Sequence, residues 1–263
     1  RLGCRVTAIN LETDGLFPRP PEPVPENLKA LGALVRRSKA DVGIAVDPDV
    51  DRLAVVDERG RPIGEDYTLA FAIRAVLGKR AKGRGQRIVV CNLSTSLVVE
   101  DAAQGVGATV VRAPVGEAHV ARKIIELKSV IGGEGNGGVM YPALHVGRDA
   151  PVAGALLLGL LARERVSVSA LVDRHPRYTI VKAKLERGTR NADAMGQVYA
   201  ALRAHFSDAS ADTQDGLRLA WPDRWLHVRP SGTEPIIRLI AEAPSGADAD
   251  KLIAEGRRLC AAL

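Results

Sequence analysis

The order of apolar patterns along the chain constrains its fold more than any other feature. Between residues 65 and 165, short apolar runs typical of strands alternate with stretches of helical periodicity. This alternation indicates parallel strands covered by helices on both faces. From Leu217 to Ala241, by contrast, three strand-like runs follow one another without a helix, which indicates an antiparallel sheet. The sequence therefore predicts an α/β fold that ends in a small α+β unit.

The first 64 residues carry a shorter pattern of strands and one helix. Arg5–Ile9 reads as a strand, and the proline-rich stretch that follows it reads as an extended surface loop. A helix is predicted from Pro25 to Arg37, followed by two short strands at Val42–Val46 and Leu53–Val56. With 263 residues the chain is long enough for three units, which we place at 1–64, 65–174 and 175–263.

Composition narrows the classes of partner. The net charge of +6 favours an anionic partner, and phosphorylated small molecules fit it. Nucleic acid is weakly supported, because no basic run is interleaved with aromatic residues. No apolar run approaches the 18 residues of a spanning helix, the first residues do not resemble a signal peptide, and the three cysteines are far apart. We expect a cytoplasmic protein without a nucleic-acid or membrane partner.

Three carboxylates recur at alternate positions between two apolar runs, at Asp47, Asp49 and Asp51. In extended backbone their side chains point to the same side, and a hard divalent cation, Mg²⁺ above all, relieves their mutual repulsion. An exposed acidic turn is the alternative. However, the apolar runs place this loop at the end of a buried sheet, where α/β proteins often bind ligands. We therefore predict a Mg²⁺ site here.

The acidic loop has two other interpretations. A calcium-binding EF-hand loop needs glycine at its sixth position, where this chain has Arg52, and the LAVV that follows predicts a strand, so we reject it. A phosphatase of the haloacid-dehalogenase type, with Asp47 as nucleophile, stays open on this motif alone.

Residues 132–138 form a glycine loop, GGEGNGG. It fits the GxGxxG pattern formally, but a dinucleotide site needs a helix next, and the following VMYP discourages one. Glu134 and Asn136 stand between the glycines, which let a ligand approach the backbone closely. A carboxylate and an amide suit sugar hydroxyls, so we predict that these two residues bind a sugar.

The segment from His227 to Pro235 links two predicted strands of the last unit. Arg229 offers a planar donor fork for phosphate oxygens. Ser231, Thr233 and the backbone around Gly232 add further donors. This combination between two prolines favours an anion-binding loop over a plain hairpin turn.

Taken in this order, the three loops resemble the α-D-phosphohexomutase family, the phosphoglucomutases and phosphomannomutases. DPDVDR is similar to that family's metal loop, GEGNGG to its sugar-recognition loop and RPSGTEP to its phosphate-binding loop. The resemblance covers the whole chain. It implies α/β domains with mixed sheets and a small C-terminal domain, so that residues 1–64, 65–174 and 175–263 would be the end of domain 2, domain 3 and domain 4. The GGEGNGG…YP…HVGRDA version resembles the archaeal-type phosphoglucosamine mutases, whereas other branches carry Ser at position 136 and His at 138.

The resemblance also implies a role for each motif residue. The Mg²⁺ ligands would be Asp47, Asp49 and Asp51, and Arg52 would steady the phosphoryl group in transit. The sugar would be held by Glu134, Asn136, Gly116 and Glu117. The phosphate that does not react would be held by Arg229, Ser231, Gly232 and Thr233. Four further residues lie near these motifs. Helix capping is favoured for Ser96, and a surface or packing role for His119. Ser94 could reach the site from the end of a strand, and Arg148 could equally bind phosphate or serve local structure.

The resemblance implies an enzyme that interconverts glucosamine 6-phosphate and glucosamine 1-phosphate. The family's nucleophile is a phosphoserine in a Ser-His-Asn loop of the first domain, and this sequence contains no Ser-His pair. We expect a C-terminal fragment whose partner is the N-terminal part of the same enzyme, and which is inactive alone. Mannose or glucose phosphates are alternative substrates. A haloacid-dehalogenase-type phosphatase and a non-catalytic anion-binding module are the less favoured alternatives.

Overall fold

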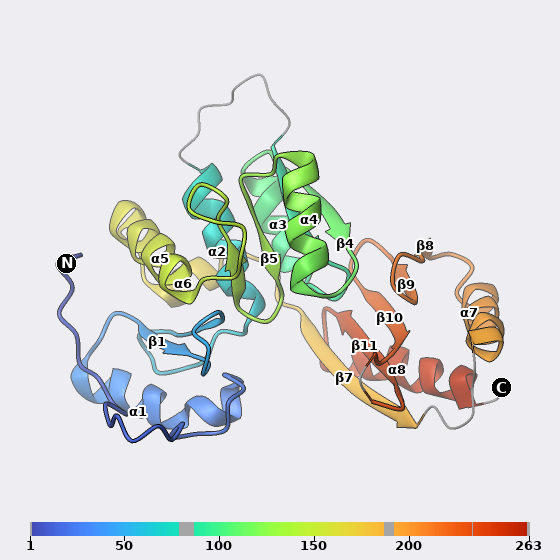
Figure 1. Cartoon of the computed structure of the whole chain (residues 1–263), viewed down its shortest axis with the longest axis horizontal. Helices are drawn as coiled ribbons and strands as arrows, with labels where there is room; N and C mark the ends of the chain where they lie inside the picture. The colour runs from blue at the N-terminus through green and yellow to red at the C-terminus, as the bar shows by residue number, and fades with distance from the viewer. Residues whose placement is uncertain (1, 79–86, 187–191, 233, 262–263) are drawn as a thin grey trace.

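A computed structural model describes residues 2–78, 87–186, 192–232 and 234–261 of the chain. The elements form three consecutive groups (Figure 1). The N-terminal and middle groups overlap along the longest axis of the molecule, and the C-terminal group occupies the other end of this axis. Within the described ranges, no helix combines the length and apolar character needed to cross a membrane.

The N-terminal group is a helix packed on a two-stranded sheet. It contains the 3₁₀ helix η1 (Pro25–Leu28), α1 (Lys29–Ser38), β1 (Gly43–Val46) and β2 (Leu53–Val56). Proline at the start of η1 agrees with the predicted helix start, because proline lacks the N–H that would be unpaired there. The two strands pair antiparallel, with Val46 opposite Leu53, so the loop between them leaves from their common end.

The strand predicted at Arg5–Ile9 is wrong. Residues 2–24 form neither helix nor strand in the structure, and most of their side chains are exposed. Val6, for example, is 81% exposed. A strand persists only when a neighbouring strand pairs with its backbone groups, and the sheet of β1 and β2 includes no residue of this described segment. The apolar run is therefore present without the partner that would make it a strand.

The middle group is an α/β unit with a mixed sheet, which confirms the predicted class. The sheet has the order β4-β3-β5-β6, in which β6 is antiparallel to β5 and the other pairs are parallel. Its strands are β3 (Ile88–Asn92), β4 (Thr109–Ala113), β5 (Ile131–Glu134) and β6 (Gly138–Met140). The helices are α2 (Asp66–Leu77), α3 (Val98–Gly105), α4 (Glu117–Leu127), α5 (Ala150–Glu164) and α6 (Val168–Val172).

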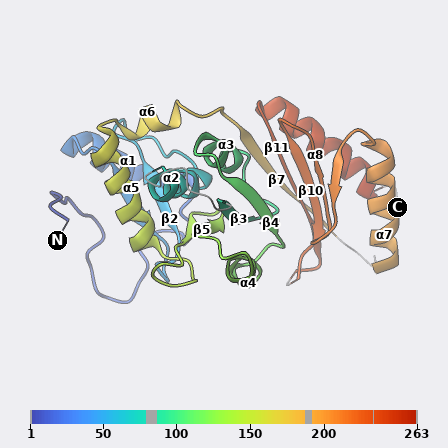
Figure 2. The same ribbon diagram turned by 90° about the horizontal axis from the view of Figure 1, so that it is seen from above.

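Helices cover both faces of this sheet, as Figure 2 shows, because successive side chains of a strand point to opposite faces. Val89 and Cys91 pack in one apolar cluster with α2 and α3, whereas Val90 packs in another with Val120 and Ile124 of α4. The three parallel strands end at the same edge of the sheet, and their last residues lead into the loops at 93–97, 114–116 and 135–137. This edge is where parallel sheets usually bind ligands.

The C-terminal group is a five-stranded antiparallel sheet with two helices. The order of its strands is β7-β11-β10-β9-β8. The strands are β7 (Thr179–Glu186), β8 (Ser210–Asp212), β9 (Leu217–Ala220), β10 (Trp225–Pro230) and β11 (Ile236–Ala243), and the helices are α7 (Ala192–His205) and α8 (Gly246–Ala261). The antiparallel sheet confirms the predicted α+β ending.

Polar contacts dock the C-terminal group onto the middle group. Glu242 of β11 is fully buried and accepts a hydrogen bond from the hydroxyl of Ser96 and one of 2.8 Å from the backbone N–H of Leu97. His227 of β10 contacts Ser94 Oγ through Nδ1 at 2.8 Å. Because these partners lie just after β3, the docking places the loop between β10 and β11 on the same side as the carboxyl edge of the parallel strands.

Candidate active site

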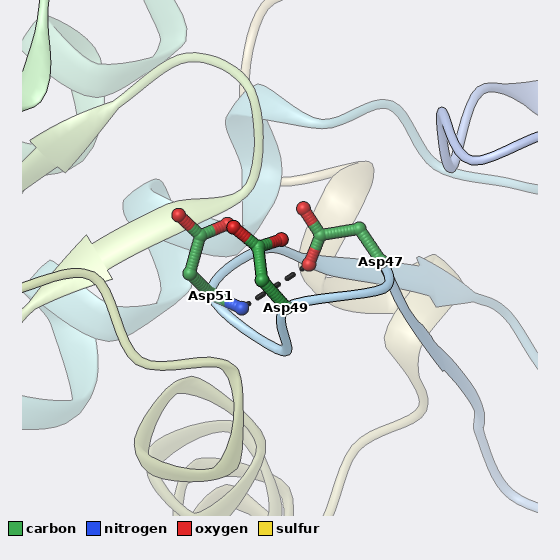
Figure 3. Close-up of side chains that lie close together, drawn as sticks. All are labelled: Asp47, Asp49 and Asp51. Carbon is green, nitrogen blue, oxygen red and sulfur yellow. Dashed lines mark hydrogen bonds between the residues drawn. The ribbon is translucent and has the colours of Figure 1, made fainter. Parts of the chain in front are cut away.

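The predicted metal loop connects β1 with β2 and holds its three aspartates close together (Figure 3). One carboxylate oxygen from each of Asp47, Asp49 and Asp51 lies within 4.8 Å of the others. The loop takes this shape because Asp47 Oδ1 accepts hydrogen bonds from the backbone N–H groups of Asp51, at 3.1 Å, and Arg52, at 3.0 Å. Val50 has a φ of 60°, which is unusual for a β-branched residue and is a form of strain often found at functional sites.

The pKa values of the first and last aspartates of the loop are shifted in opposite directions. Burial opposes ionisation of Asp47, but hydrogen bonds from the backbone and side chain of Arg52 outweigh it and lower the pKa of Asp47 to about 2. Burial raises the pKa of Asp51 to about 6, opposed by the guanidinium of Arg148 and reinforced by the neighbouring aspartates. The loop therefore concentrates more negative charge than its fixed cations neutralise.

The donor set of this loop fits a hard divalent cation. All three candidate ligands are carboxylates, the ligand type that Mg²⁺ prefers. Oδ1 of Asp51 is buried and accepts no hydrogen bond from a described donor, and its ion pair with Arg52 Nε is long, at 3.7 Å, which leaves room for a closer positive partner. Asp47, Asp49 and Asp51 are the residues that would hold Mg²⁺.

Arg52 follows the three aspartates directly and is mostly buried, with 17% of its side chain exposed. Its Nε pairs with Asp47 and its Nη1 lies 2.6 Å from Glu22, which belongs to the N-terminal segment. Burial lowers the basicity of Arg52, but the hydrogen bonds to Glu22 and Asp47 outweigh it and raise its pKa. The guanidinium is thus a permanent positive charge beside the metal loop.

The glycine loop is the tip of the β5–β6 hairpin, so a strand follows it and not the helix of a dinucleotide site. Glu134 ends β5 and is 4% exposed. Its Oε1 accepts hydrogen bonds from Asn92 Nδ2, at 2.8 Å, and from the backbone N–H of Gly116, at 3.1 Å. Its Oε2 accepts one from Arg148 Nη1 at 3.1 Å. Three donors therefore fix the orientation of this carboxylate.

The same hairpin touches the metal loop through its backbone. The carbonyl oxygen of Gly137 accepts a hydrogen bond of 3.0 Å from the N–H of Leu53, the first residue of β2. Gly137 has a φ of +88°, and a Cβ there would lie 2.5 Å from the carbonyl oxygen of Leu53. Asn136 Oδ1 accepts a hydrogen bond from the N–H of Gly138 at 3.2 Å, which closes the turn. The tip can approach β2 this closely because position 137 has no side chain.

The turn at Gly116 and Glu117 joins this cluster. Gly116 has a φ of +123° and precedes α4, and its N–H points to Glu134. Glu117 Oε1 accepts a hydrogen bond of 3.0 Å from the backbone N–H of Arg148. Two of the four predicted sugar-binding residues thus contact each other directly, and Glu117 is connected to them through Arg148. His119 is exposed on α4.

The predicted phosphate loop connects β10 with β11. Its shape is fixed by a hydrogen bond of 2.8 Å from the N–H of Ser231 to the carbonyl of Ile236. Arg229 is mostly buried, with 17% of its side chain exposed, and its Nη1 lies 3.6 Å from Asp215 Oδ2. Gly232 is exposed at the tip of the loop. Thr233, also predicted to bind phosphate, lies outside the described residues.

The phosphate loop is connected to the Gly116 turn through Asp215. Asp215 Oδ2 accepts a hydrogen bond of 3.1 Å from the N–H of Val115 and also lies beside Arg229. The backbone carbonyl of Asp215 lies 2.7 Å from Nε2 of His227. Polar contacts therefore run without a break from the phosphate loop to Val115, the neighbour of the glycine that contacts Glu134.

Sequence patterns did not identify the role of three residues of this cluster. They gave no site prediction for Asn92 or Asp215, and for Arg148 they left phosphate binding and local structure equally open. Arg148 in fact contacts Asp51, Glu117 and Glu134, which belong to three separate segments. The position of Asn92, as the last residue of a parallel strand, was the one available signal. No local pattern indicated the others.

Three family models match consecutive parts of the chain. All three describe phosphoglucomutase/phosphomannomutase. Residues 1–60 match its alpha/beta/alpha domain II, residues 64–178 its alpha/beta/alpha domain III and residues 180–259 its C-terminal domain.

Archaeal proteins are among the curated relatives of this chain. A probable phosphoglucosamine mutase of Methanopyrus kandleri is 40% identical over 246 residues, which are 93% of this chain and 53% of the relative. A phosphoglucomutase/phosphomannomutase of Thermococcus kodakarensis is 38% identical over 262 residues, covering 98% of this chain and 56% of the relative. The chain therefore spans about half the length of the curated relatives it matches.

Solved structures agree with these matches. A phosphoglucomutase/phosphomannomutase family protein from Burkholderia thailandensis superposes with a TM-score of 0.77 and 28% identity, covering 92% of this chain and 51% of that protein. An N-acetylphosphoglucosamine mutase of Aspergillus fumigatus, solved in complex with GlcNAc-6P and magnesium, has a TM-score of 0.56 at 17% identity, covering 83% of this chain and 48% of that protein. The second comparison is a likeness of fold.

Proposed function

Because this chain belongs to the phosphoglucomutase/phosphomannomutase family, we propose that it carries the metal-binding, sugar-binding and phosphate-binding parts of a phosphohexomutase. The complete enzyme would interconvert glucosamine 6-phosphate and glucosamine 1-phosphate through a phosphoserine and a bisphosphate. The amino sugar is supported by the Methanopyrus kandleri relative, whose name is probable phosphoglucosamine mutase. The Thermococcus kodakarensis relative supports mannose or glucose phosphates as the second candidate substrates.

The observation that carries this proposal is the convergence of carboxylate oxygens in the metal loop. Asp47, Asp49 and Asp51 bring one oxygen each within 4.8 Å of the others, in a loop that Gly137 ties to the glycine hairpin. When bound there, Mg²⁺ would neutralise charge on a phosphoryl group in transfer. The magnesium in the Aspergillus fumigatus structure agrees with this choice of metal.

The chain's own residues would orient and hold the substrate. Arg52 would provide a fixed positive charge next to the transferred group. Three donors fix the orientation of Glu134. Together with Asn136, it would offer hydrogen-bond acceptors in fixed directions to the sugar hydroxyls. Arg229 would grip the phosphate that does not react through its planar fork, assisted by Ser231 and by the exposed backbone at Gly232.

The haloacid-dehalogenase alternative is not favoured by the state of Asp47. That chemistry needs Asp47 as an accessible nucleophile. Asp47 is 1% exposed, and both of its oxygens accept hydrogen bonds from the loop. We propose a structural and metal-binding role for Asp47 instead.

We further propose that the domain boundaries fall after residues 64 and 174, and that the N-terminal part of the enzyme supplies the phosphoserine. The matched ranges of the three family models meet at residues 60–64 and 178–180, within a few residues of these boundaries. The lengths of the relatives support a further part of comparable size in the complete enzyme.

Calorimetric titration tests the binding part of the proposal. The chain, with Mg²⁺ present, is titrated with glucosamine 6-phosphate and with mannose 6-phosphate. We expect glucosamine 6-phosphate to bind more tightly, and Arg229→Lys to weaken both, because an ammonium cannot replace the bidentate fork. Arg258→Lys, at an exposed ion pair of α8, is the control that leaves both affinities unchanged. Tighter binding of mannose 6-phosphate would favour the second candidate substrate.

A turnover assay tests the proposed division of the enzyme. The 263-residue chain alone is expected to show no mutase activity, and activity is expected once the polypeptide that carries the phosphoserine is added. Turnover by the chain alone would contradict this assignment.

A further inference from the structure

Arg148 stands at the point where the metal loop, the glycine hairpin and the Gly116 turn meet. Its Nη2 pairs with Asp51 Oδ2, its Nη1 lies 3.1 Å from Glu134 Oε2, and its Nε lies 3.3 Å from Glu117 Oε2. Only 18% of the side chain is exposed. The planar guanidinium of arginine can pair with three carboxylates at once. The ammonium of lysine, on its flexible stem, cannot pair with them in the same geometry.

The backbone around Arg148 fixes where this guanidinium lies. Arg148 forms a β-bridge with Met140 of β6, and its own N–H donates to Glu117 Oε1. The next residue, Asp149, caps α5 by accepting a hydrogen bond of 2.8 Å from Val152. The N–H of Ala150 donates to the carbonyl of Val50 in the metal loop at 3.3 Å. The segment is therefore anchored on both sides of the arginine.

Gly138 provides the space for this side chain. A Cβ at position 138 would lie 2.3 Å from Cδ of Arg148 and 3.0 Å from its Cγ. The φ of Gly138 is outside the left-handed region, so its backbone would accept another residue. The absence of a side chain at 138 is thus needed mainly for the path of Arg148, since the next nearest atom, Asn136 Oδ1, would lie 3.1 Å from the Cβ.

We propose that Arg148 is a positioning residue that couples the metal loop to the sugar-binding hairpin, and that it competes with a divalent cation for the carboxylate of Asp51. This inference rests on the proposed function, in that it takes Asp47, Asp49 and Asp51 as metal ligands. A cation bound by Asp51 draws that carboxylate away from Arg148. The guanidinium then pairs more fully with Glu134 and Glu117, so metal binding is transmitted to the residues that face the sugar.

This arrangement has a signature that a merely structural ion pair lacks. Removing Arg148 removes a positive charge next to the metal loop, so divalent cations bind more tightly. Removing it also cuts the connection between Asp51 and Glu134, so the glycine hairpin stops responding to the metal. An Arg148 that only stabilised the fold would also carry its positive charge next to the metal loop, so the response of the hairpin to the metal is the readout that separates the two roles.

The test uses Mn²⁺ as the probe, with its affinity for the chain measured by electron paramagnetic resonance. Arg148→Gln is expected to bind Mn²⁺ about three- to tenfold more tightly than the wild type. Gly138→Ala keeps every charge and is expected to change the affinity in the same direction by displacing Arg148. Arg74→Gln removes another partly buried ion pair, with Glu164, and is expected to leave Mn²⁺ affinity unchanged.

Hydrogen–deuterium exchange provides the second readout. In the wild type and in Arg74→Gln, saturating Mn²⁺ is expected to change the protection of residues 132–138, and in Arg148→Gln it is expected to leave their protection unchanged. Two results overturn the inference. One is Mn²⁺ binding by folded Arg148→Gln that is equal to or weaker than that of the wild type. The other is a change in the protection of residues 132–138 on Mn²⁺ binding that is the same in Arg148→Gln as in the wild type. If the wild type itself does not bind Mn²⁺, the metal assignment of the proposed function fails first, and this inference fails with it.

Discussion

Asp47 and Asp51 show how neighbouring donors and charges set the state of a single residue. Asp47 receives hydrogen bonds from the backbone and the guanidinium of Arg52, so its pKa is low in spite of its burial. Asp51 is partly buried next to the other two carboxylates, and burial and these neighbours raise its pKa, although Arg148 opposes this. Asp49 is exposed and accessible to a ligand. It is the aspartate whose replacement disturbs the rest of the loop least.

Asp49→Asn is therefore the cleanest test of the metal site. An amide keeps the size of the side chain but removes one negative charge from the ligand set, so Mn²⁺ affinity is expected to fall at least about tenfold. The circular dichroism spectrum and melting temperature are expected to stay unchanged. Asp41→Asn, at an exposed aspartate before β1, is the control with unchanged affinity. Equal Mn²⁺ binding by wild type and Asp49→Asn would remove Asp49 from the ligand set.

Asp66 is a second residue whose surroundings change its chemistry. It lies at a cavity of about 400 Å³ where the three groups of elements meet, lined also by Glu65, Lys182 and Glu242. Burial raises the pKa of Asp66 to about 8, the N–H of Ser96 and Lys182 oppose the shift, and Glu242 and Glu65 reinforce it. At neutral pH the folded state therefore keeps a proton that the unfolded state has lost.

This difference in protonation predicts how stability depends on pH. Because the folded pKa is above the unfolded one, the contribution of Asp66 is fully present below about pH 4 and is lost as pH rises towards about 8. Asp66→Asn cannot ionise and keeps an oxygen for the N–H of Ser96. It is expected to exceed the wild type in unfolding free energy by about 1–3 kcal/mol at pH 8 and to match it near pH 4. Urea unfolding at both pH values measures this, and a gap that does not change with pH would contradict it.

At the scale of elements, the β5–β6 hairpin organises the site. It contributes Glu134 and Asn136, and through Gly137 it contacts the first residue of β2, just after the metal loop. The hairpin and the metal loop are far apart in sequence and become neighbours because Gly137 has a positive φ and no side chain. One short turn thus sets the distance between sugar-binding and metal-binding residues.

Gly137→Ala is expected to destabilise the protein by about 2–4 kcal/mol, because its Cβ would meet the carbonyl of Leu53 at 2.5 Å and the left-handed backbone adds strain. Thermal unfolding measures the loss. Gly159→Ala is the matched control. Gly159 is exposed within α5 and a Cβ there meets no described atom within 4 Å, so alanine should be neutral or slightly stabilising. If Gly137→Ala and Gly159→Ala had similar melting temperatures, the backbone at position 137 would have shifted to accommodate the added Cβ.

Local sequence signals were sufficient for elements whose pattern is complete within a few residues. The α/β and α+β parts of the fold were predicted and confirmed, because hydrophobic periodicity is local. Arg5–Ile9 failed because a strand also depends on a partner elsewhere. Arg148 was undervalued for the same reason, since its partners lie on three segments and only the folded chain brings them together.

At the scale of the whole molecule, the site depends on how the C-terminal group docks. Asp215 accepts a hydrogen bond from Val115 in the middle group and lies 3.6 Å from Arg229 in the phosphate loop. His227 is 1% exposed and burial lowers its pKa to about 4, so it is neutral at physiological pH and its contact with Ser94 is between uncharged groups. The position of Arg229 relative to the sugar-binding residues therefore relies on a few polar contacts between the groups.

Asp215→Ala tests this dependence because it removes both contacts of the carboxylate at once. Arg229 would keep its charge but lose the carboxylate that positions its guanidinium. The affinity for glucosamine 6-phosphate is therefore expected to fall about five- to tenfold, which corresponds to the loss of one charge-assisted contact of about 1–1.5 kcal/mol. Mn²⁺ affinity should be unchanged, since the metal loop belongs to a different group of elements. Asp223→Ala, at the exposed turn between β9 and β10, is the matched control that should alter neither affinity. A parallel loss of Mn²⁺ and sugar-phosphate binding in Asp215→Ala would point to general unfolding, and unchanged sugar-phosphate binding would show that Arg229 is positioned without Asp215.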